Sequence, residues 1–343
     1  TPNNQYKYVT TYTYCLVGPK LLNQYVYFTN KETGSDDKPI YFTGGELIDG
    51  PMRSNDYIYI DNTNGNPTFN GTIEFKGMKT DIASQPISES NYEDYANLGG
   101  LPKYRILSNS DTSGLDFSSI ASEYKTNLQT MVKPYSDLQT SPATPTGIQF
   151  TKDITLSFNH GTGSDYDLLI YEGSDVDKSK IRYKIKWKPS GAPNATVVKE
   201  SRKNEKKEWK QDYQVDTLFN GVIYSTGNIT LDSDSTYLSK YYGNYTLYSE
   251  KDIYIKDRLI PYDTYTNYFT NQETQYSGTE ISASTINNIK DYVSANEKSS
   301  LNLVAKNNVI VSETNGTKPY NMKLFASIYA FNGSFEVEGY DSD

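Results

Sequence analysis

The stretch "VIYSTGNITL" at 222–231 decides the fold, because its pattern returns along the chain. Each copy has an apolar residue, any residue, then Ser or Ala, two or three turn-forming residues, and an apolar–any–apolar run. The other copies are "TLYSEKDIYI" at 246–255, "NLVAKNNVIV" at 302–311, "SIYAFNGSFEV" at 327–337 and "PMRSNDYIYI" at 51–60. A small residue beside Asn, Asp or Gly is typical of a tight bend between two short strands.

The spacing of the copies predicts how these strands are arranged. The steps from Ile223 to Leu247 and from Leu303 to Ile328 are 24 and 25 residues, which is within the range of solenoid repeats. We therefore predict an all-β-dominated protein built on a right-handed parallel β-helix, with one or two short helices. Stacked rungs would pair their backbones about 4.8 Å apart and bury the Ile, Leu and Val columns inside.

We predict a single domain, 1–343, which the less regular parts of the chain divide into segments. We expect first strands and rungs at 1–78, an inserted lobe at 79–215, and regular rungs at 216–343. The last part carries an excursion at 257–300, since the step from Leu247 to Leu303 is 56 residues. An insertion as long as the predicted lobe needs packed structure of its own.

Periodicity predicts further elements. At 118–133 the residues Ile120, Tyr124, Leu128 and Met131 share one helical face, and Pro134 ends the run. The alternation of "KIRYKIKWK" at 180–188 predicts a half-buried strand with Ile181, Tyr183, Ile185 and Trp187 on one side. Other expected elements are a strand face formed by Tyr6, Tyr8, Tyr12 and Tyr14 and a short helix at 284–293.

Composition limits the possible partners. The 343 residues have a net charge of -9, and the mean hydropathy is -0.70. Dispersed positive charge disfavours nucleic acid, and the lack of a long apolar stretch argues against membrane insertion by this segment. The chain begins at Thr1 without an initiator methionine, so we expect a processed piece of a longer protein.

Residues that could carry chemistry are few. Glycoside hydrolysis needs two carboxylates across a cleft, and nothing in the pattern of the 42 acids selects a pair. His160 is the only histidine and Cys15 the only cysteine. "GSDVDKSKI" begins like a calcium loop at Asp175, but Lys180 occupies the required glycine position. We predict no catalytic residue, metal site or cofactor, although calcium held by turn carbonyls stays open.

Binding through aromatic rings is the remaining candidate activity, since the chain has 33 tyrosines. The position after the first apolar residue of each repeat should face outward, which predicts an exposed column of Tyr224, Tyr248 and Tyr329. The strand centres predict a second outward column containing Tyr254 and Tyr59. The alternative is that the inserted lobe covers these rings and makes them part of a core.

The excursion holds a further group of rings in "PYDTYTNYFTNQETQY" at 261–276. Its rings are Tyr262, Tyr265, Tyr268, Phe269 and Tyr276. In an extended chain the three-residue tyrosine spacing is about 10 Å, which matches the two-sugar step of cellulose. We predict that these rings bind carbohydrate, and the alternative is a loop folded onto the β-helix with Phe269 as its anchor.

The repeats, together with "LLNQYVYFTN" at 21–30 and "GPMRSNDYIYIDNTNGNPTFNGTIEFKG" at 50–77, resemble β-helix proteins of bacterial surface and pilus-associated loci. The Tyr- and Thr-rich form looks most like the C-terminal domain of the tāpirins. Tāpirins are extracellular adhesins of plant-biomass-degrading thermophiles, encoded near type IV pilus genes, that attach cells to cellulose without cleaving it. The resemblance implies a non-catalytic cell-surface adhesin domain whose partner is cellulose or a related insoluble plant polysaccharide.

Two other functions are compatible with the predicted fold. Many polysaccharide lyases and hydrolases use a β-helix, although fold alone is a weak argument for activity. The chain could also be a structural pilus-associated protein that meets pilus or other cell-surface components instead of sugar.

Overall fold

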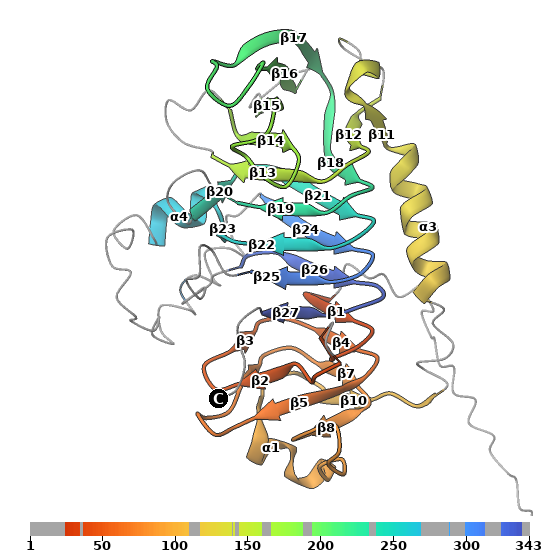
Figure 1. Ribbon diagram of the computed structural model, residues 1–343. Helices are drawn as coiled ribbons and strands as arrows, with labels where there is room; N and C mark the ends of the chain where they lie inside the picture. The colour runs from red at the N-terminus through yellow and green to blue at the C-terminus, as the bar shows by residue number, and fades with distance from the viewer. Residues whose placement is uncertain are drawn as a thin grey trace, which may run out of the picture.

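The protein is a stack of short strands, shown as a computed structural model in Figure 1. The structure describes residues 25–34, 37–109, 117–138, 140, 144–159, 166–187, 194–232, 238–268, 288, 299–312 and 324–337. Strands dominate these residues, which confirms the all-β expectation. The strand face expected at 6–17 lies outside the described residues, as does all of the helix expected at 284–293 except Asn288.

One ten-stranded sheet, here called the long sheet, runs the length of the stack, and all its neighbouring strands are parallel. In spatial order its strands are β10 (Tyr104–Ile106), β7 (Ile73–Phe75), β4 (Met52–Ser54), β1 (Tyr27–Thr29), β26 (Ser327–Ala330), β24 (Ser300–Ala305), β21 (Asn244–Ser249), β18 (Phe219–Ser225), β12 (Thr146–Phe150) and β11 (Val132–Pro134).

Each N-terminal rung continues from the long sheet into two smaller parallel sheets. One sheet consists of β2 (Tyr41–Thr43), β5 (Tyr57–Asp61) and β8 (Gly77–Lys79), and the other of β3 (Leu47–Ile48), β6 (Thr68–Phe69) and β9 (Asn97–Leu98). The short helices η2 (Glu89–Asn91) and α1 (Tyr92–Tyr95) follow β8.

The C-terminal rungs continue into a nine-stranded sheet. Its parallel part consists of β13 (Ile154–Phe158), β19 (Ile229–Leu231), β22 (Ile253–Ile255), β25 (Val309–Val311) and β27 (Phe335–Val337). Beyond β13 it becomes antiparallel through β14 (Leu168–Glu172), β15 (Ile181–Trp187), β16 (Ala195–Ser201) and β17 (Lys210–Thr217). A fifth sheet, of two strands, pairs β20 (Leu238–Tyr241) with β23 (Arg258–Pro261).

Spatial order differs from chain order. Strand β1 lies between β4 and β26, so the last rung of the chain packs on the first. Helix α3 (Phe117–Thr130) runs along the side of the stack and returns the chain from the N-terminal rungs to β11 at the opposite end (Figure 1). The predicted helix is confirmed for most of its length, but it ends at Thr130 and not at Pro134, because Val132 enters the long sheet. Met131, predicted on its helical face, lies beyond the helix and is 43% exposed. The short helix η3 (Tyr135–Asp137) follows.

The predicted repeat register is confirmed. Ile223 pairs with Leu247, Leu247 with Leu303, and Leu303 with Ile328, while Tyr27 joins Ile328 to Met52. All six of these side chains are buried. Burying a Leu, Ile or Met side chain contributes about 1.5–3 kcal/mol, so this inward column is a main source of stability.

The strand predicted at 180–188 is also confirmed, as β15, with Tyr183 and Ile185 buried and Trp187 packed against the core. The boundaries of the inserted lobe stay a prediction. Within its predicted range, β10, β11 and β12 all pair in the long sheet.

A ladder of Asp and Asn side chains joins the bends of successive rungs. The Oδ1 atom of Asp153 accepts the backbone N–H of Asn228 at 2.8 Å, and Oδ1 of Asn228 accepts that of Asp252 at 3.2 Å. Asp252 accepts the N–H of Asn308 at 2.9 Å, and Asn308 that of Ser334 at 3.0 Å. Alternation of Asp with neutral Asn keeps like charges off neighbouring rungs about 4.8 Å apart.

Replacing Asn228 by alanine is expected to lower the free energy of unfolding by about 1 kcal/mol, because the Asp252 N–H loses its acceptor. Urea denaturation measures the change. Asn332→Ala, at an exposed position in the last bend, is the control and should change stability little. Equal losses in the two variants would contradict a role for the ladder.

Candidate functional site

The predicted column of Tyr224, Tyr248 and Tyr329 is buried, with the three residues 0%, 1% and 5% exposed. All three lie on the outer face of the long sheet, in one register column through Val304. Helix α3 packs against this column, and Figure 1 shows the helix running beside the stack. The prediction of an exposed column is wrong, and the alternative of a cover supplied by residues from 79–215 is what the structure contains.

The contacts of these rings explain their burial. Tyr224 and Tyr248 are stacked, with ring centroids 5.1 Å apart and planes 12° apart, so they face each other instead of solvent. Tyr124 of α3 stacks on Tyr248 at 6.2 Å, and Gln129 Nε2 donates to Tyr224 Oη at 2.9 Å. In-register tyrosines on parallel strands therefore form a packing surface for a helix.

Polar contacts hold α3 in this place. Lys125 Nζ lies 2.7 Å from Glu250 Oε2, and the Tyr224 hydroxyl donates to the other oxygen of Glu250. Burial raises the pKa of Tyr124 to about 12. The rings of Tyr124 and Tyr224 are thus buried in contacts within the protein.

The excursion begins as a helix, and the expectation of an extended chain is wrong there. Tyr262, Tyr265 and Tyr268 belong to α4 (Tyr262–Tyr268), whose first turn contains Asp263, a favourable charge at a helix N-terminus. Tyr265 is buried at 4% exposure, with Lys240 Nζ 4.1 Å from its ring centroid, and Tyr262 is half-buried. The side chain of Tyr268, and all of Phe269 and Tyr276, lie outside the described residues.

The prediction of a second column with Tyr254 and Tyr59 is wrong, because the two tyrosines lie on different sheets. Tyr254 is half-buried on β22, between Thr230 and Ile310 in the register. Tyr59 lies on a different sheet, in the N-terminal rungs, and is only 5% exposed.

The outer face of the sheet β2–β5–β8 brings three tyrosines together. Tyr41, Tyr57 and Tyr59 point outward, while the alternate residues Phe42 and Ile58 are buried inward. We call these three residues the tyrosine face. Tyr41 pairs with Tyr59 in the register, and their ring centroids lie 6.3 Å apart at an angle of 67°. Tyr41 and Tyr57 are half-buried, so part of each is open to solvent.

The neighbours of Tyr57 hold its ring in place. Gly77 lies beside it in the register, with φ +140°, and a Cβ there would lie 3.3 Å from the Tyr57 ring. Lys79 Nζ sits 5.0 Å from the ring centroid of Tyr57 and donates to the carbonyl of Ile82 at 2.9 Å. Gly77 has no side chain to displace the Tyr57 ring, and the Lys79 ammonium group lies close to it. Together they fix the position of the ring on the sheet.

Acidic groups border the tyrosine face. Burial raises the pKa of Tyr41, and the nearby carboxylates of Asp81 and Asp61 raise it further. The Thr63 hydroxyl and backbone N–H donate to Asp61 Oδ1 at 2.7 and 3.0 Å, which lowers the pKa of Asp61. Rings bordered by carboxylates and an ammonium form a surface that can contact both the apolar faces and the hydroxyls of a sugar.

The sequence pattern placed Tyr59 outward, but in one column with Tyr254, which lies on another sheet, and it missed Tyr41 and Tyr57. The alternation of "DYIYI" at 56–60 carries the signal, because Tyr57 and Tyr59 are two residues apart and share a strand face.

The residues considered for metal or catalysis have other roles or lie outside the described part. Asp175 Oδ1 accepts the N–H groups of Asp177 and Lys178 at 3.0 and 3.2 Å, and Asp175 Oδ2 pairs with Lys178 Nζ at 2.7 Å. Among the described residues there is no group of three His, Cys, Asp or Glu that could hold a metal ion. His160 and Cys15 are not described. No helix in the described ranges has the length and apolar character to cross a membrane.

Comparison with known proteins finds a family that matches part of the chain. Residues 3–77 match a family described as a domain of unknown function, DUF4900. The matched range contains Tyr41, Tyr57 and Tyr59 of the tyrosine face. No curated protein and no solved structure matches the chain.

Proposed function

We propose that the stacked rungs form a right-handed parallel β-helix, and that this chain is a non-catalytic, extracellular adhesin domain at the cell surface. Its ligand in this proposal is insoluble plant polysaccharide, with cellulose as the leading example. The observation that supports the proposal best is the tyrosine face, where in-register strands present partly open rings with charged groups beside them.

A parallel sheet suits this task because it is rigid. Tyr41 pairs in the register with Tyr59, and Tyr57 lies two residues earlier on the same adjacent strand, so the Tyr41 and Tyr57 side chains are about 7–8 Å apart on the diagonal, somewhat less than the roughly 10 Å step of two sugars in an extended polysaccharide. Rings that are ordered before binding lose little conformational entropy on contact with the ligand. The 67° angle between the Tyr41 and Tyr59 rings means that they do not form one continuous platform, so Tyr41 and Tyr57 are the main contacts in this proposal.

The test is depletion of the purified chain from solution by microcrystalline cellulose, at low and high salt. Each sugar–ring contact is expected to contribute about 1 kcal/mol, so Tyr41→Ala/Tyr57→Ala should weaken binding about tenfold or more. The variant Tyr41→Phe/Tyr57→Phe keeps the rings and should retain most of the binding.

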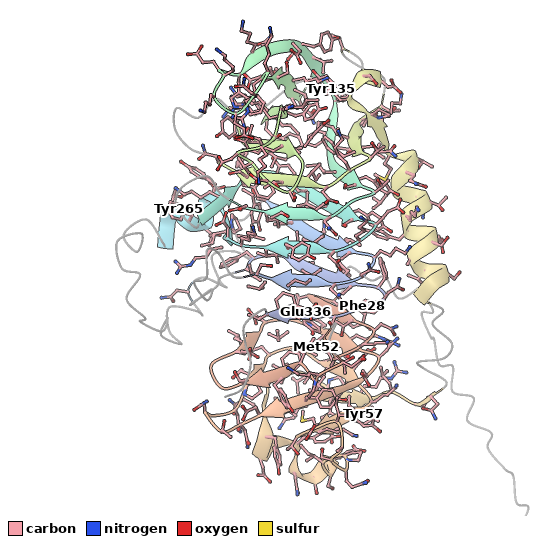
Figure 2. All side chains as sticks on the ribbon, in the orientation of Figure 1. Phe28, Met52, Tyr57, Tyr135, Tyr265 and Glu336 are labelled. Atoms are coloured by element: carbon pink, nitrogen blue, oxygen red, sulfur yellow. The ribbon has the colours of Figure 1, made fainter. Side chains whose placement is uncertain are left out.

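Tyr213→Ala is the matched control, since Tyr213 is 52% exposed and lies on β17 at the other end of the stack (Figure 1). Figure 2 places Tyr57 in the N-terminal rungs, away from Tyr265 of α4. A native chain that stays in the supernatant would refute cellulose binding. Equal binding by the native chain and the double alanine variant would refute the tyrosine face as its site.

A further inference from the structure

The N-terminal and C-terminal rungs meet where β1 pairs with β26, and we call this strand pair the junction. Only the long sheet crosses it, because the nine-stranded sheet ends at β27 and shares no strand with β2–β5–β8 or β3–β6–β9. The inward-facing buried side chains form two separate clusters, one on each side. Phe335 of β27 packs against both clusters, with its ring centroid 6.1 Å from that of Tyr27. One strand pair therefore joins two sets of rungs that each have their own core.

A buried carboxyl group lies beside the junction. Glu32 follows β1 in the chain and is fully buried. Its Oε2 accepts the Tyr27 hydroxyl at 2.8 Å, and its Oε1 accepts the Thr29 hydroxyl. The carbonyl of the next residue, Thr33, accepts the hydroxyl of Ser334 from the last bend at 3.2 Å. Glu32 therefore holds both the ring and the loop that the last rung contacts.

No Lys or Arg pairs with the Glu32 carboxyl in the part of the chain that the structure describes. The ionisable groups that face it are Asp56, Tyr27 and Tyr59, and Glu46 lies near Tyr27. The backbone nitrogen of Glu32 lies 3.4 Å from Asp56 Oδ2. The last rung contributes a hydroxyl and a phenyl ring, which are uncharged. Ionised Glu32 would be a buried charge beside a second carboxylate, which is costly without a counter-ion.

Protonation of Glu32 is therefore linked to docking of the two sets of rungs. Burial raises the pKa of Glu32 to about 7. If β1 separates from β26 and solvent reaches the carboxyl, its pKa returns toward the ordinary value of 4.5. The docked junction thus holds a proton that the open junction releases. The contribution of Glu32 to docking is fully present below pH 4.5 and is lost as the pH rises through about 7.

We propose that the junction is a pH-sensitive switch: β1 stays paired with β26 while Glu32 is protonated, and separates from it when Glu32 ionises. The rungs on each side keep their own inner clusters, so both sets remain folded. On the outer face, the cluster under α3 includes Phe28 and Tyr329, so this helix tethers the two sets when the strands separate. The proposal rests on the fold and not on a polysaccharide ligand.

Amide hydrogen exchange of the full chain at pH 5 and pH 8, followed by NMR, tests the switch. The Ile328 N–H donates to the Val26 carbonyl at 3.2 Å across the junction, so its protection reports docking. We expect its protection factor, which corrects for the intrinsic pH dependence of exchange, to fall on the order of fiftyfold at pH 8. The N–H groups of Met52 and Ile253 donate within the N-terminal and C-terminal rungs, and their protection should change much less.

Variants identify the group that responds. Glu32→Gln has a similar shape and no proton to lose in this range, so Ile328 should be equally protected at both pH values. Glu123→Gln, at an exposed position of α3, is the control and should respond as the native chain does. Tyr27→Phe removes a donor that favours the ionised carboxylate, so the midpoint of the response should move to higher pH. This second variant tests the switch even if Glu32→Gln does not fold.

Three results would overturn the proposal. The first is an Ile328 protection factor that does not differ between pH 5 and pH 8. The second is a pH response that persists in Glu32→Gln or keeps its midpoint in Tyr27→Phe. The third is an equal loss of protection at Met52, Ile253 and Ile328, which would mean that the whole stack opens as one unit. Because none of these measurements uses cellulose, their failure leaves the tyrosine-face proposal to its own test.

Discussion

Replacing Leu247 by alanine is expected to lower the free energy of unfolding by about 3 kcal/mol. Leu247 is fully buried in the inward column, where it pairs with Ile223 on one side and Leu303 on the other. Rungs on both sides hold their backbone positions through parallel pairing, so the core cannot collapse around the smaller side chain. The lost methyl groups leave a cavity in the middle of the stack. Chemical denaturation followed by circular dichroism measures the effect.

The same substitution at Leu101 is the matched control, because this leucine is 94% exposed. We expect Leu101→Ala to change stability by less than about 0.5 kcal/mol. A Leu247→Ala variant as stable as the Leu101→Ala variant would mean that the column does not form the core.

Acidification is expected to stabilise the N-terminal rungs through Glu32. This residue is fully buried, and its carboxylate accepts hydrogen bonds from the hydroxyls of Tyr27, at 2.8 Å, and Thr29. Burial raises the pKa of Glu32 from 4.5 to about 7, and the nearby carboxylate of Asp56 acts in the same direction, while the Thr29, Ser54 and Tyr27 hydroxyls oppose the rise. The folded protein therefore holds a proton that the unfolded chain releases at lower pH.

The sign of the pH dependence follows from this difference. Stability from Glu32 is fully present below pH 4.5 and is lost as the pH rises to about 7, in total about 3 kcal/mol. Denaturation curves between pH 4 and pH 8 measure it, and Glu32→Gln should flatten this part of the profile. Glu123→Gln, at an exposed position of α3, should leave the profile unchanged. A profile that Glu32→Gln does not alter would rule out this residue as the source.

Much of the rung structure could be predicted from the repeats. The bend residue, the first apolar position and the strand pair lie within about ten residues of each other, so local pattern was enough to align Ile223, Leu247, Leu303, Ile328 and Met52. The Asp/Asn ladder had a similar signal, since Asp153, Asn228, Asp252 and Asn308 each come directly before a strand.

The site was harder to predict because exposure is not a local property. Alternation correctly placed Tyr224 and Tyr248 on the outer face of the long sheet, but it could not say what lies over that face. The residues that cover them come from α3, about a hundred positions earlier in the chain. Tyr262 and Tyr265 were assigned to an extended chain from their spacing alone, and their backbone is helical instead.

The sequence by itself thus determined the strand-rich class, the rung length and which residues face inward, because a period of 24 or 25 residues and a small bend residue are written into each repeat. Only the tertiary structure decided that the last rung packs on the first, with Ile328 beside Tyr27, and that α3 covers one aromatic surface while the tyrosine face stays partly open. The physical reason is that inward positions are set by alternation within a strand, whereas exposure of outward positions depends on segments far away in the sequence.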